Sequence, residues 1–389
     1  MILLIVGCGI AADPQIPKAR TNPAPKVTCE ATRYGARLVP DSGIWFGVNL
    51  DWARDSPAAY GARLGRPPAV VTEFAVVPFI AHEAAQLDRI VQGLAQSGGM
   101  LLLTLEPRNG LEAITDAVAD QVALRLARYN VAGVPVFLRF AHEMNGSWYP
   151  WSQRPRAYIA SFRRLARAVH AHAPLSAMLW APNYGGGYPF TDGAYMAQRG
   201  SADATALDTN HDARLDHADD PYAPYYPGDD VVDWVGMSLY HWGHRYPWGE
   251  NELPEPDKFA RMLSGTYRGA GEDESHLPDF YAEYGQMRGK PVGVFETAAF
   301  YAPANAGVDE AGEHEFAIKS AWWTQVYAPD IAGRFPLLRM INWFEWDKYE
   351  TEVHTRVKWG VTMEPRMRHA FRATLPGWAR FAGDVHFCR

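Results

Sequence analysis

The sequence predicts a single (β/α)8 barrel, an α/β fold in which eight parallel strands alternate with helices and long loops extend from the C-terminal face. Eight short apolar stretches have the character of buried parallel strands. Helical stretches lie between most of them. In addition, two of the strands end in glutamate, which is expected where functional groups gather at the carboxyl ends of barrel strands.

The expected strands are short, apolar and bounded by turn-forming or polar residues. They cover residues 44–50, 69–74, 100–105, 136–140, 177–181, 231–239, 292–295 and 338–344. The expected helices cover residues 82–96, 111–129, 155–171, 257–267 and 313–327. The 389 residues exceed a bare barrel of about 250, and long loops explain the excess more simply than a second domain.

The glutamates that end the fourth and seventh strands form the most informative pair in the chain. Glu143 lies beside His142 and is followed by a turn and a cluster of indole and phenol rings. Glu296 ends a short strand bounded by glycine and proline. Hydrolysis of a glycosidic bond usually needs two carboxyl groups, about 5–5.5 Å apart in retaining enzymes. A barrel would bring both to one face, whereas a lone strand-end glutamate could simply cap a helix or pair with an arginine.

Residues 142–148, His-Glu-Met-Asn-Gly-Ser-Trp, resemble the acid/base segment of glycoside hydrolase family 26, the retaining β-mannanase-type enzymes. The resemblance extends from about residue 44 to residue 378, and Glu296 falls where that family keeps its nucleophile. It implies that Glu143 is the general acid/base of a double displacement that needs no cofactor. Because Glu143 must be protonated to act as the acid, we expect the nearby charge of Glu296 to raise its pKa.

The same resemblance assigns roles to four further residues. It implies that His142 and Tyr240 hold the orientation and charge of the nucleophile. It also implies that Trp148 and Trp343 shape the site around the sugar next to the scissile bond. The alternative for each of them is ordinary packing at a strand end or under a loop.

Two departures from the mannan-cleaving members leave the substrate open. Those members resemble each other in a histidine at the end of the third strand, where this chain has Glu106, and they tend to place an arginine where this chain has Phe344. Glu106 could accept hydrogen bonds from sugar hydroxyls or pair with a nearby arginine. Related enzymes also cut mixed-linkage β-glucan and β-1,3-xylan, so the resemblance implies a β-linked polysaccharide without identifying it.

Aromatic side chains after the fourth and sixth strands should line a groove that is open at both ends, as an endo-acting enzyme needs. They are Trp148, Tyr149, Trp151, Tyr240, Trp242 and Trp248. We expect Trp148, Tyr149 and Trp242 to contact the substrate, whereas Trp151 and Trp248 could instead pack under loops. Three classes of function follow: a retaining endo-β-glycosidase, a transglycosylase with the same residues, and a sugar-binding barrel without catalysis. The presence of both glutamates argues against the last class.

Composition and the amino terminus suit an exported protein. The net charge of −7 and the lack of a sustained basic run argue against nucleic acid and anionic membranes as partners. Residues 1–12 are apolar but too short to span a bilayer, and they read as an incomplete signal or as a lipoprotein-type segment with Cys8 as the lipidated residue. Residues 13–40 are a proline-rich tether, and residues 41–389 are the barrel. We expect a secreted or lipid-anchored monomer.

Two stabilising features are also expected. Cys29 and Cys388 could form a disulfide at the non-catalytic end of the barrel, since export permits it. In residues 208–219, oxygen ligands occur at the spacing of an EF-hand calcium loop, in which Arg214 would contribute its backbone carbonyl. Position 6 of this loop is Ala213 rather than glycine, and the alternative is a solvated acidic loop. The expected calcium ligands are Asp208, Asn210, Asp212, Arg214, Asp216 and Asp219.

Overall fold

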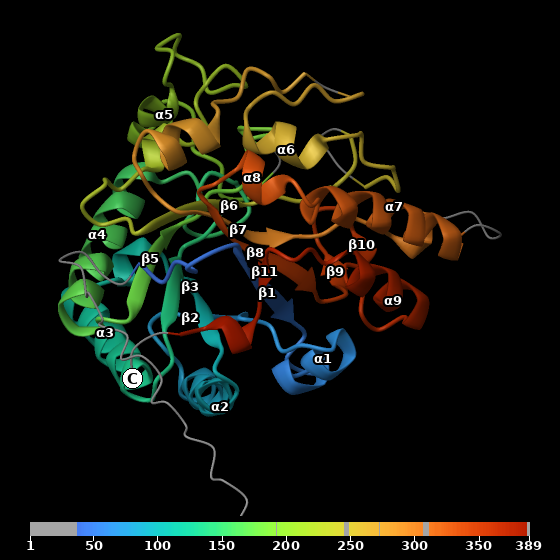
Figure 1. Cartoon of the computed structure of the whole chain (residues 1–389). Coiled ribbons are helices and arrows are strands. Elements are labelled where there is room, and N and C mark those ends of the chain that lie inside the picture. Colours follow the sequence, from blue (N-terminus) through green and yellow to red (C-terminus); the bar gives the residue numbers. More distant parts are fainter. Residues whose placement is uncertain (1–36, 192, 245–248, 272, 306–310, 387–389) are drawn as a thin grey trace, which may run out of the picture.

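Eight strands pair side by side in chain order and close into a parallel barrel (Figure 1). The computed structural model describes residues 37–386 except 192, 245–248, 272 and 306–310. The barrel closes where β8 pairs with β1, from Trp45 opposite Met340 to Leu50 opposite Glu345. Its strands are β1 (Ile44–Leu50), β2 (Val70–Val76), β3 (Met100–Glu106), β4 (Val136–Phe140), β5 (Ser176–Trp180), β6 (Trp234–Ser238), β7 (Val292–Thr297) and β8 (Leu338–Glu345).

Helices surround these strands (Figure 1), which confirms the predicted (β/α)8 barrel. Their ends follow local sequence signals: the side chains of Ser56 and Thr115 cap the amino ends of α1 and α3, and Gly98, with φ 77°, ends α2. The helices are α1 (Pro57–Leu64), α2 (Ala81–Ser97), α3 (Asp116–Val131), α4 (Pro155–His172), α5 (Ala202–Leu207), α6 (Lys258–Leu263), α7 (Ala311–Val326), α8 (Ile331–Arg334) and α9 (Pro365–Thr374).

All eight predicted strands and all five predicted helical regions are present, with differences at their ends. The region predicted as one helix over 111–129 is a short 3-10 turn, Leu111–Ala113, followed by α3, because the Thr115 side chain accepts a hydrogen bond from the Val118 amide and starts a new helix. The helix predicted over 257–267 ends at Leu263, shortly before Gly265 turns the chain with φ 59°. Helices α1, α5, α8 and α9 were not predicted from the sequence.

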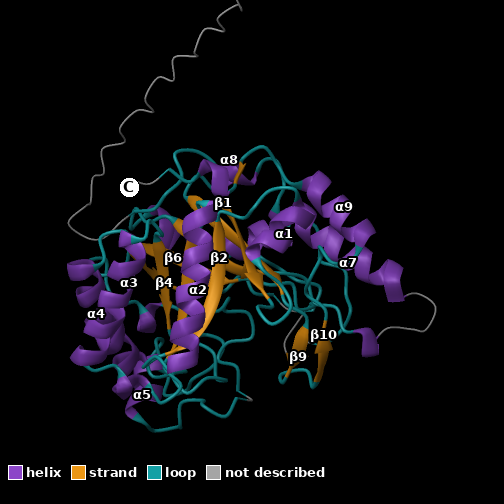
Figure 2. Cartoon of the chain, turned by 90° about the horizontal axis from the view of Figure 1, so that it is seen from below, coloured by secondary structure: helices purple, strands orange, loops and turns teal. Residues whose placement is uncertain are grey.

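Three short strands were also not predicted from the sequence. β11 (Ala379–Arg380) adds to β1 beside the barrel. β9 (Lys348–Glu350) and β10 (Thr355–Val357) form an antiparallel hairpin directly after β8. Figure 2 shows this hairpin standing apart from the strands of the barrel. Since it follows the carboxyl end of β8, it lies on the face where a barrel of this kind carries its site.

The two ends of the barrel interior differ in polarity. Large apolar side chains fill the interior near the amino ends of the strands, where the rings of Phe137 in β4 and Trp234 in β6 meet edge to face with their centroids 5.2 Å apart. Nearer the carboxyl ends the buried side chains become polar, among them Thr72, Arg139 and Ser238. Buried polar groups need partners. The polar end is therefore the part of the barrel interior that is built to hold specific contacts.

Several predictions concern residues outside the described part of the chain. They are the signal-like segment 1–12 with Cys8, most of the tether, the cysteines Cys29 and Cys388, and Trp248. The signal, the lipid anchor and the disulfide therefore stay predictions. Among the described residues, no helix combines the length and hydropathy that crossing a bilayer requires.

Candidate active site

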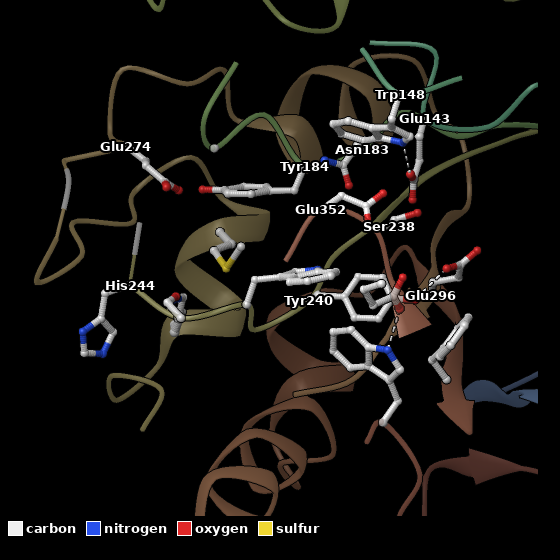
Figure 3. A pocket seen from close by; sticks show the side chains of 18 of the residues that line it. Glu143, Trp148, Asn183, Tyr184, Ser238, Tyr240, His244, Glu274, Glu296 and Glu352 are labelled. Carbon is white, nitrogen blue, oxygen red and sulfur yellow. Dashed lines mark hydrogen bonds between the residues drawn. The ribbon is translucent and has the colours of Figure 1, made fainter. Parts of the chain in front are cut away.

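A single pocket contains both predicted glutamates (Figure 3). It lies at the carboxyl ends of β4, β6, β7 and β8, and loops after these strands complete it. Its lining combines carboxylates with aromatic rings, which is the composition that a sugar-binding enzyme site needs. The lining residues used below are Glu143, Trp148, Tyr149, Asn183, Tyr184, Ser238, Tyr240, Trp242, Glu296, Phe344, Lys348, Glu350, Glu352 and Trp359.

Glu143 enters the pocket from a strained turn that follows β4. Ala141 and Glu143 have φ values of 45° and 53°, in the left-handed region that costs a non-glycine residue roughly 1–3 kcal/mol. Neighbouring segments hold this turn, since the Glu143 amide donates to the Ala181 carbonyl at 2.9 Å. The Asn145 side chain clamps the backbone of Asn183, donating to its carbonyl and accepting from its amide at 2.8 Å each. The strain therefore appears where the fold aims a carboxyl group into the pocket.

Arg139, which the sequence analysis did not single out, connects the two glutamates. Its fully buried guanidinium donates from Nη1 to Glu296 Oε1 and from Nη2 to Ser238 Oγ at 2.7 Å. Nη2 also lies 4.0 Å from Glu143 Oε1. Burial opposes the charge, but the carboxylates of Glu296 and Glu143 raise the pKa of Arg139. An arginine within an apolar strand was a usable signal, because a buried charge needs a charged partner.

The carboxyl group of Glu296 is held at both oxygens. Arg139 contacts Oε1, and the Tyr240 hydroxyl donates to Oε2 at 2.5 Å. Arg139 from β4 and Tyr240 from the segment after β6 fix the plane of the carboxyl group, which faces the pocket from the end of β7 (Figure 3). Tyr240 thus makes the contact with the predicted nucleophile that the sequence resemblance implies for it.

Glu143 has an environment that favours its protonated form. Burial, and then the charge of Glu296, raise the pKa of Glu143 to about 7, while Arg139, Ser238 and Trp148 oppose the shift. Trp148 does so through its indole Nε1, which donates to Glu143 Oε2 at 3.1 Å. The expected direction of the shift is found, although burial contributes more to it than the charge of Glu296 does.

His142 does not have the position predicted for it. Among the described residues, the side-chain hydrogen bonds to Glu296 come from Arg139 and Tyr240. The His142 ring packs against Phe74, with centroids 5.6 Å apart, and its buried Nδ1 has no hydrogen-bond partner within the described part of the chain. Burial, and then the charge of Arg139, hold the pKa of His142 well below its usual value, so the ring is neutral. Arg139 makes the contact with the Glu296 carboxyl group that was expected of His142.

Trp343 and Glu106 also lie outside the pocket lining. Trp343 is completely buried and packs against Phe371 and Tyr327. Side chains alternate along a strand, so Phe344 reaches the pocket while Trp343 faces the surrounding helices. Glu106 forms an ion pair with Arg108 at 2.8 Å, which is the structural alternative considered for it.

The other aromatic predictions divide between the pocket and the core. Trp148, Tyr149 and Trp242 line the pocket, as expected. Trp151 is completely buried, stacks on Tyr149 at 4.5 Å and donates to the His142 carbonyl at 2.7 Å. It therefore packs beneath the pocket, which is the alternative that the sequence left open.

The β9–β10 hairpin supplies pocket residues that sequence reasoning missed. Lys348 and Glu350 are alternate residues of β9, and Glu352 belongs to the turn after it; all three line the pocket. Glu350 accepts a hydrogen bond from Trp359 Nε1 at 2.8 Å. Strands this short carry almost no sequence signal, because a few alternating residues do not stand out from a loop.

The acidic loop over residues 208–219 satisfies its oxygens locally. The Asp208 carboxylate accepts from the amides of Asp212 and Ala213, and Asp219 accepts from the amide of Thr209. Ala213, at position 6, has φ 67°, which lies in the left-handed region that favours glycine. No group of three or more His, Cys, Asp and Glu among the described residues is arranged to hold a metal. The calcium site stays a prediction, which melting curves with calcium and with a chelator would test.

Comparisons with known proteins bear on the segment that carries Glu143. The sequence profile of glycosyl hydrolase family 26 matches residues 104–196. The chain is 27% identical to endoglucanase H of Acetivibrio thermocellus over 181 residues, which are 44% of this chain and 17% of that protein. It is 24% identical to a β-1,3-xylanase of a Vibrio species over 222 residues, which are 54% of this chain and 41% of that protein. The chain thus matches less than half the length of either relative.

Solved structures extend the likeness to the whole barrel. An endo-β-1,4-mannanase from Cellulomonas fimi has a TM-score of 0.56 at 16% identity, over 93% of this chain and 77% of that one. The catalytic domain of a family 26 endo-β-1,4-mannanase from Bacillus sp. JAMB-750 has a TM-score of 0.52 at 14% identity, over 91% of this chain and 92% of that one. At these identities the structures show a shared fold. The predicted resemblance to glycoside hydrolase family 26 is therefore confirmed by sequence over residues 104–196, and the solved structures show that the fold of the whole barrel is shared.

Proposed function

We propose that this protein is a retaining endo-β-glycosidase that hydrolyses a β-linked polysaccharide by double displacement. The observation that carries the proposal is the geometry around Arg139: one buried guanidinium contacts Glu296 and approaches Glu143 to 4.0 Å, so carboxyl groups from β4 and β7 face one small space. Their environments differ, since two donors hold Glu296 whereas burial keeps Glu143 protonated up to about pH 7. Two carboxyl groups in different protonation states are what retaining glycosidases use.

In this mechanism Glu296 attacks the anomeric carbon while Glu143 donates its proton to the departing glycosidic oxygen. A covalent bond then joins Glu296 to the sugar, and the negative charge that raised the pKa of Glu143 is lost. Arg139 remains beside Glu143, so the pKa of Glu143 falls and its carboxylate can take a proton from water. Water releases the sugar from Glu296 with the original anomeric configuration. Glu143 thus acts first as acid and then as base, Glu296 acts as nucleophile and then as leaving group, and neither step uses a cofactor.

We infer the substrate class from the names of the relatives. Their names record action on β-1,4-mannan, on β-1,3-xylan and as an endoglucanase. β-Mannan and mixed-linkage β-glucan are therefore our leading candidates. The pairing of Glu106 with Arg108 removes one position at which mannan-cleaving members contact sugar. A polymer of this kind cannot enter a cell, which supports the export expected from residues 1–12.

A panel of mannan, mixed-linkage glucan, β-1,3-xylan and bacterial exopolysaccharides tests this proposal. We expect one of these polymers to be cut internally, so that long oligosaccharides precede short ones. Proton NMR of the first product should show the β anomer before mutarotation. An α anomer would contradict the retaining mechanism, and release of only short sugars from chain ends would contradict endo action.

The pH dependence of kcat/KM should follow the protonation state of Glu143. Because this group must be protonated to act as the acid, kcat/KM should fall as the pH rises through about 7, the pKa of Glu143. Trp148→Phe removes a hydrogen bond that stabilises the carboxylate, so it should move this fall to higher pH. The profile of kcat/KM on a soluble oligosaccharide measures both effects. A profile of Trp148→Phe that moves to lower pH would contradict this account of the site.

A further inference from the structure

The β9–β10 hairpin forms one wall of the active pocket, and the family resemblance assigns no role to it. Lys348 and Glu350 share one face of β9, and Glu352 follows in the turn. All three line the pocket that contains Glu143 and Glu296. The hairpin thus places a cation and two carboxylates next to the predicted catalytic pair.

The packing of the hairpin holds the Lys348 ammonium in place. It lies 5.4 Å above the Phe344 ring and 5.7 Å above the Trp346 ring, and it is 3.2 Å from Glu350. Glu350 is itself fixed by the indole of Trp359. Burial opposes the charge on Lys348, but the carboxylates of Glu350 and Glu296 raise its pKa, so it stays protonated. An ammonium has three N–H donors, and Glu350 engages only part of this capacity.

Glu352 presents an acceptor beside this donor. Its side chain is exposed, and within the described part of the chain its carboxylate forms no hydrogen bond. Figure 3 shows the side chain directed into the pocket, between Tyr184 and Glu296. A carboxylate that accepts hydrogen bonds and an ammonium that donates them match two hydroxyl groups of one sugar ring.

We propose that the β9–β10 hairpin is a sugar-recognition element, in which Lys348 donates to one hydroxyl and Glu352 accepts from another hydroxyl of a sugar unit bound in the pocket. This inference rests on the proposed glycosidase function and adds two specificity-determining residues to it. The Glu352 carboxylate also gives the wall a charge that a sugar carboxylate would meet at close range, so the hairpin disfavours anionic units.

Replacing the hairpin groups should weaken substrate binding more than the chemical step. Glu352→Gln keeps an acceptor oxygen but turns a charge-assisted hydrogen bond into a weaker neutral one, so it should raise KM by about tenfold while kcat changes little. Because Lys348→Met would leave Glu350 buried without a cation, the double variant Lys348→Met/Glu350→Gln is the suitable test of the lysine, and it should also raise KM. Steady-state kinetics on whichever polymer the unchanged protein cuts would measure both effects.

Arg356→Met is the matched control. Arg356 pairs opposite Tyr349 on β9, and Tyr349 is 57% exposed on the face away from Lys348 and Glu350. The control removes a cation from the same hairpin without touching the pocket wall, so its KM should equal that of the unchanged protein. A rise in KM as large as that of Glu352→Gln would show that the hairpin acts only through its folding, and would overturn the inference.

A charge test separates the inference from the proposed function. A lightly carboxymethylated form of the same polymer should be cut more slowly than the plain polymer. The ratio of the two cleavage rates, plain polymer over carboxymethylated polymer, should be several fold smaller for Glu352→Lys. Added salt should also lower this ratio for the unchanged protein. If both polymers are cut and Glu352→Lys has the same rate ratio as the unchanged protein, the inference is overturned but the proposed function is not. No cleavage of any polymer by the unchanged protein would overturn the proposed function and this inference with it.

Discussion

Glu296→Ala should lose activity by orders of magnitude, and azide should restore part of it as a glycosyl azide of inverted configuration. The variant lacks the group that would bond to the anomeric carbon, while Glu143 can still protonate the leaving oxygen. Azide is small enough to occupy the space that the lost carboxyl group leaves between Arg139 and Tyr240. Attack by azide in one step inverts the anomeric centre. The rate of phenol release from an activated aryl glycoside measures the activity, and NMR of the glycosyl azide gives its configuration.

Glu143→Ala should behave differently in the same assay. Loss of general acid/base catalysis typically costs about 10²–10⁴-fold, and the loss should be smaller for an aryl glycoside whose leaving group needs no proton. The glycosyl-enzyme on Glu296 still forms, so azide attacks it from the opposite face and gives a product of retained configuration. The fall in kcat/KM near pH 7 should disappear, because the group responsible for it is gone.

Glu112→Gln is a matched control for both substitutions. Glu112 is an exposed glutamate that pairs with Arg154 and lies outside the pocket lining. The Glu112→Gln variant should hydrolyse the substrate at the rate of the unchanged protein, and azide should not change that rate. The assignment of roles would be wrong if the two azide products had the same configuration, or if either substitution left the rate within a few fold of the control.

Arg139→Met should damage both activity and stability. Arg139 is fully buried and contacts Glu296 and Ser238, and its charge also acts on Glu143. Removing one partner of a buried charge pair typically costs about 3–5 kcal/mol, because the remaining charge stays buried without compensation. Activity should fall as well, since Glu296 would keep Tyr240 as its only side-chain donor among the described residues.

The stability loss in Arg139→Met should depend on pH. In the unchanged protein the pKa of Glu143 is raised from 4.5 to about 7, and Arg139 opposes this shift. Without Arg139 the pKa of Glu143 rises further. A carboxyl group with a raised folded pKa contributes stability that is fully present below its unfolded pKa and is lost as the pH rises through its folded pKa. The variant should therefore lose more stability relative to the unchanged protein at pH 8 than at pH 5.

Urea unfolding at the two pH values measures this difference, and Arg164→Met is its control. Arg164 pairs with Asp116 at 2.7 Å, but the Asp116 side chain is 89% exposed. Exposed ion pairs contribute about 0–1 kcal/mol, so this control should change the free energy of unfolding little at either pH. Equal losses for Arg139→Met at pH 5 and pH 8 would contradict the electrostatic coupling between Arg139 and Glu143.

The sequence by itself determined the barrel and its two principal carboxylates. Glu143 and Glu296 could be found because Glu143 follows one apolar strand and Glu296 lies at the end of another, and a parallel barrel gathers the carboxyl ends of its strands on one face whatever the details of packing. The same logic located Tyr240 after β6 and the aromatic residues after Glu143. These are consequences of chain position, which a sequence records directly.

Only the tertiary structure decided which side chains face one another. A strand of a parallel barrel is buried on both faces, so its sequence lacks the apolar-polar alternation that would show which residues point inward. All of β4 is buried, and so is nearly all of β8. An arginine in an apolar strand indicated that a charged partner exists, but sequence reasoning could not tell that Arg139 points inward to Glu296 while Trp343 faces the helices. Arg139 pairs with Glu296 across 157 positions of the chain. This pairing and the position of the β9–β10 hairpin depend on contacts that form only in the folded protein.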